Sequence, residues 1–415
     1  MKKIAIIGSG ISGLSAAHYL SLRHEVHVFE KDNRLGGHTN TVTVDSENGP
    51  LPIDTGFIVH NELTYPNFCR LMKSLGVEAQ ASDMSFAVTA HQGAFEYSSR
   101  GLGGFFAQKR NWYSRDHYKL LGEILRFNRE APKVLEREDA AELTLAEFLE
   151  AGRYSPVFTE RYLIPMAGAV WSMSPDAMPG FPVLTLVRFM QNHGMLGVNT
   201  HPKWKTIQGG SNTYLAPLTA RYRKRIRKDV DITAVERFDQ GVRLCFSTGP
   251  AEMFDQIVFA CHGDQILPLL AQPTEAERRI LANFKTTRNE ACLHTDTAML
   301  PTREAARASW NYLLGDTRNV TLTYHMNRLQ ALTAKEDYCV SLNANGAVDS
   351  GKVVRRMVYE HPLYNREAIR AQEQWALING RNHTHFCGAY WFYGFHEDGV
   401  RSGMRVAEAM GVSCA

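Results

Sequence analysis

The sequence predicts an α/β protein whose first unit is a strand, a glycine-rich turn, a helix and a second strand. Residues 4–7 (IAII) form an apolar run that is too short for a helix and suits a buried parallel strand. The run GSGISG follows at residues 8–13, and residues 14–20 (LSAAHYL) have the composition of a helix. The second strand, residues 26–29 (VHVF), ends at Glu30, 22 residues after the first glycine of the turn. This order is typical of the first half of a dinucleotide-binding unit.

The small and polar residues of this unit each have an expected role in binding a dinucleotide. Gly8 allows the tight turn, Gly10 lets the backbone approach a pyrophosphate, and Gly13 lets helix and strand pack closely. The amides at the helix N-terminus, with Ser12 in the first turn, then point at the phosphates. The Glu30 carboxylate is placed to accept hydrogen bonds from an adenosine ribose.

Composition and charge narrow the class of protein. The 415 residues are 44% hydrophobic and 21% charged, which is typical of a globular chain long enough for two domains. The net charge of +3 gives no reason to expect a nucleic-acid partner. Six cations crowd residues 221–228 (RYRKRIRK), and we expect a solvated helix end there rather than a nucleic-acid patch.

Cysteine usage and the N-terminus bear on the cellular compartment. The seven cysteines are scattered, odd in number and never spaced as CxxC, which indicates a reducing compartment and no structural metal site. The basic start is followed by only four apolar residues, too few for a signal peptide. No run approaches the roughly 18 apolar residues of a membrane span. We expect a cytoplasmic protein, or one bound peripherally to the inner face of the membrane.

The residues after Glu30 distinguish among dinucleotide-binding proteins. Residues 31–38 (KDNRLGGH) complete the pattern ExxxRxGG, and a D-x-G element follows at residues 54–57 (DTGF). In these paired motifs the chain resembles the superfamily of flavin-dependent amine oxidases, phytoene desaturases and protoporphyrinogen oxidases. The resemblance implies FAD as cofactor, with the turn along its pyrophosphate and ribityl chain and the D-x-G element near the isoalloxazine. The residues that it assigns to FAD here are Lys31, Arg34, Gly36, Gly37, His38, Thr55, Gly56 and Phe57.

The C-terminal segment is expected to bind the same cofactor. Residues 385–388 (HFCG) suit a strand that ends in glycine, and residues 399–410 suit a helix. In the superfamily this helix directs its N-terminus at the flavin N1–C2=O region, which gains negative charge on reduction. By resemblance the further FAD-binding residues are Gly388, Glu397, Asp398, Gly399 and Val400, with the backbone of Val235 beside the adenine.

The predicted fold is therefore α/β, with a Rossmann-like FAD-binding domain of the amine-oxidase type that is discontinuous in sequence. We expect this domain to comprise residues 1–76, 205–275 and 355–415. Residues 77–204 and 276–354 would form an α+β substrate domain, built on a mixed sheet plus helices.

Further stretches resemble one bacterial branch of the superfamily, described as predicted NAD/FAD-binding amine-oxidase-like proteins. Genes of that branch tend to neighbour genes for cyclopropane-fatty-acyl-synthase-like methyltransferases. The resemblance thus implies a lipid acyl chain as the substrate class and a methyltransferase as a partner. The stretches are residues 60–66, 309–312, 327–330, 360–362 and 388–399.

Three functions stay open on the sequence. The first is hydride transfer from an elongated apolar substrate to flavin N5, which leaves a C=C bond. The second is amine oxidation, in which a pair of aromatic rings holds the amine. The third is a non-enzymatic flavoprotein that binds lipid or a methyltransferase. The expected aromatic lining of the substrate pocket, some of which core packing also explains, is Phe57, Trp171, Tyr390, Trp391, Phe392 and Tyr393.

Acid–base groups are sought among the histidines. His396 is preferred, because Asp398 can orient and charge its imidazole. By resemblance, Lys285 lies in the part of the chain that holds a lysine near N5. A single histidine is more often structural than catalytic, so that alternative stays open. The other candidates are His60, His262 and His325.

Residues 100–137 differ in composition from the rest of the chain, because aromatic and cationic residues alternate there. One interpretation is a surface element that lies on anionic lipid. The other is an ordinary amphipathic helix packed on its domain, and both stay open. The aromatic residues are Phe105, Phe106, Trp112, Tyr113 and Tyr118, and the cations are Lys109, Arg110, Arg115 and Lys119.

Overall fold

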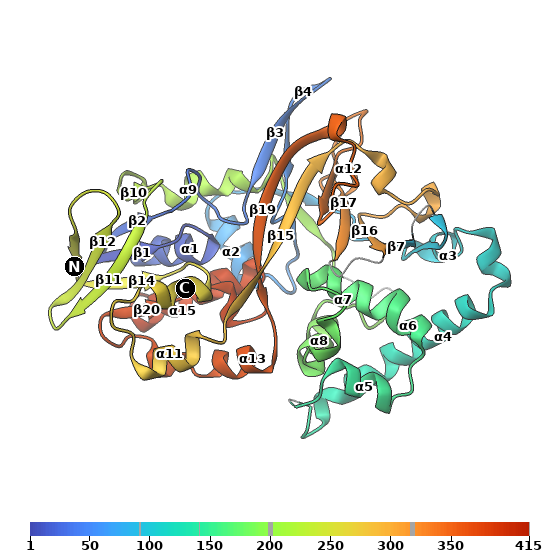
Figure 1. Ribbon diagram of the computed structural model, residues 1–415. Coiled ribbons are helices and arrows are strands. Elements are labelled where there is room, and N and C mark those ends of the chain that lie inside the picture. The colour runs from blue at the N-terminus through green and yellow to red at the C-terminus, as the bar shows by residue number, and fades with distance from the viewer. Residues whose placement is uncertain (91–92, 141, 198–201, 316–319, 415) are drawn as a thin grey trace.

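The computed structural model describes residues 1–90, 93–140, 142–197, 202–315 and 320–414. A parallel sheet with its helices lies on one side of the molecule and a larger mixed sheet on the other (Figure 1). The long strands β15 and β19 belong to the mixed sheet and lie on its side nearer to the parallel sheet. β15 spans Lys285–His294 and β19 spans Val353–Leu363.

The parallel sheet has the predicted strand–turn–helix–strand unit at its centre. Its order is β10-β2-β1-β14-β20, and every neighbouring pair is parallel. β1 is almost wholly buried, which is why its sequence is a continuous apolar run. The strands are β1 (Lys3–Ile7), β2 (Glu25–Phe29), β10 (Ile226–Arg227), β14 (Gln256–Phe259) and β20 (Thr384–Phe386).

The second sheet is mixed, as predicted for the other half of the fold. Its order is β19-β15-β18-β17-β16-β7-β8, with β7 parallel to β16 and the other pairs antiparallel. Its remaining strands are β7 (Phe86–Ala90), β8 (Glu96–Ser98), β16 (Trp310–Leu314), β17 (Thr321–His325) and β18 (Cys339–Leu342).

A helical layer lies beyond this sheet and shares one apolar core with it. A capping box opens α5, since the Glu147 carboxylate accepts from the Thr144 amide and the Thr144 hydroxyl accepts from the Glu147 amide. The helices of this layer are α3 (Gly101–Phe105), α4 (Arg115–Glu130), α5 (Leu145–Ala151), α6 (Pro156–Phe158), α7 (Ile164–Trp171) and α8 (Val183–Asn192).

Smaller sheets and helices complete the fold. The strands are β3 (Thr41–Ser46) with β4 (Gly49–Asp54), β5 (Val59–His60) with β9 (Lys205–Ile207) and β6 (Ala79–Ala81), and β11 (Ile232–Phe238) with β12 (Gly241–Phe246) and β13 (Glu252–Phe254). The helices are α1 (Ile11–Leu20), α2 (Pro66–Ser74), α9 (Leu215–Thr219), α10 (Ile266–Leu269), α11 (Glu275–Leu281), α12 (Met326–Leu329), α13 (Arg366–Glu373), α14 (Trp375–Ile378) and α15 (His396–Ala409).

Two segments pack differently from the expected division into domains. β19 pairs along its length with β15 in the mixed sheet, although most of it was assigned to the FAD-binding domain. α11 contributes Ile280 and Leu281 to the core around the parallel sheet, although it was assigned to the substrate domain. The other boundaries stay predictions.

The cationic run 221–228 is not the end of a helix, so that prediction was wrong. Arg223–Arg225 forms a short 3-10 turn, and β10 then pairs with β2 at the edge of the parallel sheet. Arg227 lies over the Phe29 ring, 4.3 Å from its centroid, and its Nη1 is 2.7 Å from Glu252 Oε1. Edge pairing and cation–π packing, which depend on distant residues, decide the conformation here.

Helices from the two ends of the chain cross in close contact. α15 packs along α1, and two glycines of α15 make the approach possible. A Cβ at Gly399 would lie 2.5 Å from Ile11 Cγ2, and one at Gly403 would lie 2.6 Å from the Ser12 carbonyl oxygen. The obstacle at Gly403 is backbone, which cannot rotate away.

We predict that Gly403→Ala and Gly122→Ala change stability in opposite directions. Gly403→Ala should lower the free energy of unfolding by about 1–3 kcal/mol, because the added carbon overpacks the helix crossing. Gly122 lies in the exposed middle of α4 with open space around its Cα, so Gly122→Ala should raise it by about 0.5–1 kcal/mol. Urea denaturation followed by circular dichroism measures both. Equal changes in the free energy of unfolding of the two variants would contradict the close contact between α1 and α15.

Candidate functional site

The first and last glycines of the GxGxxG turn are required by the chain itself. Gly8 has φ +105°, and a Cβ there would lie 2.8 Å from the Ala260 carbonyl oxygen. A Cβ at Gly13 would lie 2.1 Å from the Gly8 carbonyl oxygen. These contacts are the tight turn and the close helix–strand packing predicted for these two residues.

Gly10 differs, because nothing in the chain requires glycine there. Its φ of −66° and ψ of 173° suit any residue, and a Cβ there would meet no described atom within 4 Å. Gly10 is also the N-cap of α1, and no side chain described in the structure caps that N-terminus. Open space beside uncapped helix amides is a cradle that fits the pyrophosphate of a dinucleotide.

The Glu30 carboxylate is held rigidly at the end of β2, beside the glycine turn. Its Oε2 accepts hydrogen bonds from the Ser9 amide (2.8 Å) and the Ser9 hydroxyl (2.5 Å). Its Oε1 accepts from the Asp32 amide at 2.9 Å. The predicted contact of Glu30 with a ribose stays a prediction.

The two glycine motifs lie against each other. Gly36 forms a parallel bridge with Gly10, and its amide donates to the Ser9 carbonyl at 3.0 Å. Gly37 has φ +58°, and a Cβ there would lie 3.2 Å from Gly10 Cα. Arg34 donates through Nη1 to the Thr39 carbonyl (3.3 Å), which holds the turn closed.

The D-x-G element runs alongside the same turn. The Phe57 amide donates to the His38 carbonyl (2.8 Å), and a Cβ at Gly56 would lie 2.2 Å from that oxygen. Asp54 accepts from the Ser211 amide at 2.9 and 3.0 Å. Burial raises the pKa of the Asp54 carboxyl to about 6. The glycine turn at residues 209–210 is thereby joined to the site through Ser211.

The first turn of α15 is built differently from the prediction, because this helix begins at His396 rather than near Gly399. Asp398 accepts from the Phe395 amide (2.9 Å) and so caps its own helix instead of orienting the His396 imidazole. Burial raises the pKa of the Asp398 carboxyl to about 7. Glu397 accepts from the Phe68 amide (2.9 Å) at the N-terminus of α2. Gly399 faces α1.

His396 lies in an apolar, aromatic environment. Its ring stacks on Phe57 with centroids 3.6 Å apart and planes at 10°. Its Nε2 is 3.0 Å from Thr39 Oγ1, which also bonds the Tyr214 hydroxyl. Burial, and to a lesser degree the nearby His60, lower the pKa of the His396 imidazole to about 3. The ring is therefore neutral at physiological pH.

A second group of rings, partly or fully buried, which the sequence did not reveal as a group, gathers beside the same turn. His38 lies 5.1 Å from His361 and 6.1 Å from His262 between ring centroids, and it stacks on Tyr359 at 5.2 Å. Burial, and then the neighbouring imidazoles, lower the pKa of His38 well below its usual value. Within the described chain, His38 Nε2 is buried without a hydrogen-bond partner. These rings come from three distant segments, so no spacing could have shown them together.

The aromatic residues assigned to the substrate pocket divide between two cores. Tyr390 and Trp391 pack on Phe284, at 4.8 and 4.6 Å between centroids, in the core of the parallel sheet. Trp171 packs in the other core. Phe392 lies under the Arg401 guanidinium at 4.2 Å, and Tyr393 is half-buried. Their substrate contacts stay predictions.

For the remaining predicted catalytic and cofactor-binding residues, the structure shows the exposure or the hydrogen-bond partners. Lys285 is exposed at the start of β15, whereas a residue that acts near flavin N5 is expected to be buried. The Val235 carbonyl already accepts from the Ala271 amide at 3.1 Å, and the Gly388 amide donates to Ser402 Oγ at 2.9 Å. Lys31 is exposed, and Val400 is fully buried. The proposed cofactor contacts of these residues stay predictions.

Comparison with known proteins identifies the family. A family model for flavin containing amine oxidoreductase matches residues 11–312. The chain belongs to this family. It is an oxidoreductase that binds FAD, and the open cradle at Gly10 and the donors of α1 fit that cofactor.

Solved structures of related fold cover nearly the whole chain. Cyclohexylamine oxidase from Brevibacterium oxydans IH-35A superposes with a TM-score of 0.72 at 17% identity, over 99% of this chain and 98% of that one. A CLA-producing fatty acid isomerase from P. acnes gives a TM-score of 0.71 at 14% identity, over 99% of both chains. At these identities the likeness establishes the amine-oxidase fold alone.

One curated relative matches over a short stretch. The flavin-dependent L-tryptophan oxidase RebO of Lentzea aerocolonigenes is 48% identical over 52 residues, which are 12% of this chain and 11% of that protein.

Two absences concern the described residues only. No helix among them is long and apolar enough to cross a membrane, and no group of three His, Cys, Asp or Glu side chains could hold a metal ion.

Gly10→Ala should weaken FAD binding without lowering the free energy of unfolding of the apoprotein. The chain accommodates a Cβ at Gly10, so only a bound pyrophosphate would meet it. We expect at least about a tenfold loss of FAD affinity, because the added carbon displaces the phosphates from the helix amides. Fluorescence titration of apoprotein with FAD measures it. The control is Gly180→Ala, which also has open space, and an equal affinity for both variants would contradict the assignment.

Proposed function

We propose that this oxidoreductase removes a hydride from an elongated apolar substrate, of the class of lipid acyl chains, and leaves a C=C bond. The observation that carries the proposal is the neutral character of the imidazole rings around the paired glycine turns. His396 is buried, His38 and His361 are partly buried, and all three have lowered pKa values, so these rings are neutral at physiological pH and suit a hydrocarbon better than an ion.

Nearby carboxylates support the same conclusion. Asp54 accepts from Ser211, Glu397 caps α2, and Asp398 caps α15, so each already has partners within the chain. A protonated amine would need a carboxylate with free acceptors. FAD held at Gly10 and the amides of α1 would supply the oxidant for hydride transfer.

The chain's own residues position the substrate and exclude water. The Phe57–His396 stack offers a flat apolar surface, and the Thr39 hydroxyl fixes the imidazole through Nε2. A pKa of about 3 makes His396 a weak base at neutral pH, so we propose that it orients the substrate. His38 Nε2 has no hydrogen-bond partner in the described chain, so we propose that it takes the proton that the substrate loses together with the hydride. Because its pKa is lowered, the imidazole passes this proton on instead of holding it.

Amine oxidation is the second candidate, and one observation favours it. Asp264 Oδ1 is buried without a hydrogen-bond partner among the described residues, while Oδ2 accepts from Thr286 Oγ1 at 2.6 Å. Its charge acts on His262 in the ring group beside the glycine turns. A free carboxylate oxygen there could bind a substrate ammonium.

We also propose a membrane phospholipid as the source of the acyl chain and a methyltransferase as a partner in its modification. Two observations support this: the resemblance to the bacterial branch with neighbouring methyltransferase genes, and the cationic aromatic segment at residues 100–119. We propose that the protein acts in the cytoplasm, peripherally on the inner face of the membrane.

Anaerobic mixing should distinguish the two substrate classes. Phospholipids with unsaturated or methylated acyl chains, dispersed in detergent, should bleach the visible flavin bands of the holoenzyme, because hydride transfer reduces the cofactor. A panel of primary and secondary amines should leave the bands unchanged. Bleaching by an amine, abolished in Asp264→Asn, would replace the first proposal with the second.

His396→Gln should slow flavin reduction by substrate about tenfold or more, with FAD still bound, because the stacked surface on Phe57 is lost. Stopped-flow absorbance under anaerobic conditions measures the rate. The wild-type rate should show no titration of His396 between pH 5 and 9, since its pKa of about 3 lies below this range. Unchanged reduction kinetics in the variant would remove His396 from the mechanism.

A further inference from the structure

We propose that the surface formed by α3, the turn Lys109–Tyr113 and α4 docks onto an anionic phospholipid bilayer. We call this surface the docking face. The inference deepens the proposed function and rests on it in one respect, since it names the bilayer as the place where the acyl chain is taken up.

Large apolar side chains gather on the docking face and point to solvent. Other exposed apolar residues of the described chain are scattered in sequence, whereas five of them fall within residues 102–125. Apolar side chains in one region are typical of an interaction site, and single ones are not. The five, with their exposed fractions, are Leu102 (69%), Trp112 (49%), Tyr113 (91%), Tyr118 (49%) and Leu125 (51%).

The charge of the same segment selects an anionic partner. The docking face, residues 101–130, holds six cations and three carboxylates, so this stretch alone has a net charge of +3, equal to that of the whole chain. Lys109, Arg110, Arg115 and Lys119 are exposed, and none forms an ion pair with any described residue. Unpaired cations beside exposed aromatic rings match the headgroup region of an anionic bilayer.

The opposite side of α4 is packed, as the interpretation of this segment as an amphipathic helix on its domain predicts. His117, Leu120 and Phe127 are buried on the inner face, and His117 Nε2 is 2.8 Å from the Phe105 carbonyl oxygen. Phe106 is buried and stacks under Trp112 at 4.2 Å between centroids. The helix is thus an amphipathic helix on its domain, and its outer aromatic residues stand on a packed support.

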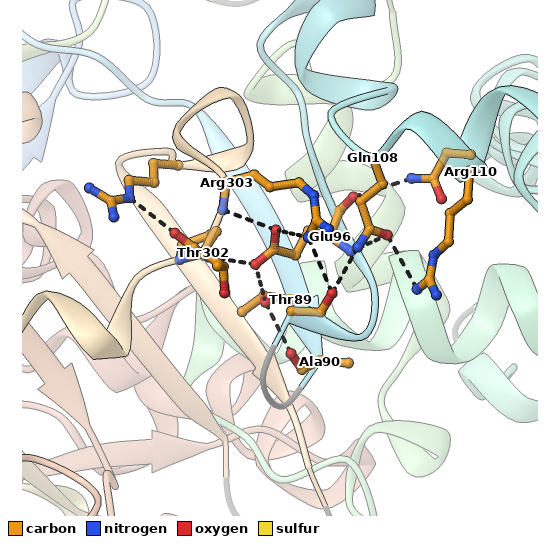
Figure 2. A network of polar contacts seen from close by, with 11 residues as sticks. Thr89, Ala90, Glu96, Gln108, Arg110, Thr302 and Arg303 are labelled. Carbon is orange, nitrogen blue, oxygen red and sulfur yellow. Dashed lines mark hydrogen bonds and ion pairs between the residues drawn. The ribbon is translucent and has the colours of Figure 1, made fainter.

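A buried polar network holds the turn that carries Trp112 and Tyr113 (Figure 2). The Glu96 side chain is fully buried and accepts from the Thr302 amide (2.6 Å) and from Arg303 Nη1 (3.0 Å). The Glu96 backbone holds the turn directly, since its amide donates to Gln108 Oε1 (3.1 Å) and its carbonyl accepts from Asn111 Nδ2 (3.3 Å). A turn fixed at Gln108 and Asn111 binds a surface with little loss of conformational entropy.

The position of the docking face in the fold suits a surface contact. α4 lies at the outer edge of the molecule, on the opposite side from the parallel sheet and both chain termini (Figure 1). α4 packs on α6, in the layer that shares its core with the mixed sheet. Docking through α4 would therefore leave the FAD-binding half free of the bilayer.

Vesicle sedimentation of the FAD-loaded protein tests the proposal. Vesicles of phosphatidylcholine with phosphatidylglycerol should bind it, and phosphatidylcholine alone should bind it about tenfold less or weaker still, because each cation near an anionic surface adds attraction. Raising the salt from 0.1 to 0.5 M should release it, because the added ions screen surface charge. Equal binding to both vesicle types, or no binding to either, would overturn the proposal.

Two variants and a matched control locate the contact. Lys109→Glu/Arg110→Glu should lower binding to anionic vesicles about tenfold or more. Arg223→Glu/Lys224→Glu makes the same charge change on another exposed cationic run and should have at most a small effect. Equal losses in both variants would show general charge attraction and overturn the assignment to this surface.

The fluorescence of Trp112 gives a readout independent of sedimentation. Trp112 is half exposed, whereas the other five tryptophans are buried or partly buried, so a blue shift on vesicle binding reports this residue. Trp112→Phe should bind vesicles and lose the shift. A shift that persists in Trp112→Phe would contradict the proposed contact.

Two further measurements separate this proposal from its alternatives. If the docking face covers a second copy of the chain, Trp112→Ser/Tyr113→Ser would convert a dimer to a monomer in gel filtration, which would overturn the bilayer assignment. Flavin bleaching by detergent-dispersed lipid does not need the docking face, so Lys109→Glu/Arg110→Glu should retain it. Vesicle binding without flavin bleaching would reject the lipid substrate and support the docking face. Flavin bleaching without vesicle binding would reject the docking face and support the lipid substrate.

Discussion

The crossing of α1 and α15 is the contact on which the rest of the site depends. Gly399 and Gly403 let the C-terminal helix approach the backbone of the N-terminal one, so the two ends of the chain form a single site. α15 also carries Glu397, which caps α2, and His396, which stacks on Phe57. A shift at the crossing would therefore move residues from both ends of the chain and from the D-x-G element together.

Around this crossing, short glycine segments replace side chains with backbone contacts. Gly36 and Gly37 lie against Gly10, and Gly56 lies against the His38 carbonyl. Backbone packed on backbone leaves little freedom, which keeps the helix amides and the Glu30 carboxylate in place for a cofactor. The flat, neutral rings of His38 and His396 then line the interior, and their lowered pKa values follow from the same exclusion of water.

Local motifs were predictable because their physical cause is local. The apolar run of β1 and the turn glycines each depend on neighbouring residues, and each lies where the sequence placed it. Predictions that depended on tertiary contacts succeeded less often. Asp398 caps its helix instead of orienting His396, and Arg227 of the cationic run lies in an edge strand instead of at a helix end.

The sequence by itself determined the fold class, the FAD-binding unit and the family resemblance, because these follow from spacings within short segments. Tertiary structure alone decided which distant residues meet. The His38 ring group joins three segments far apart in the chain, and the buried Glu96 network decides that Trp112 and Tyr113 face outward. Such groupings arise from packing over long sequence separations, which periodicity and motif spacing do not record.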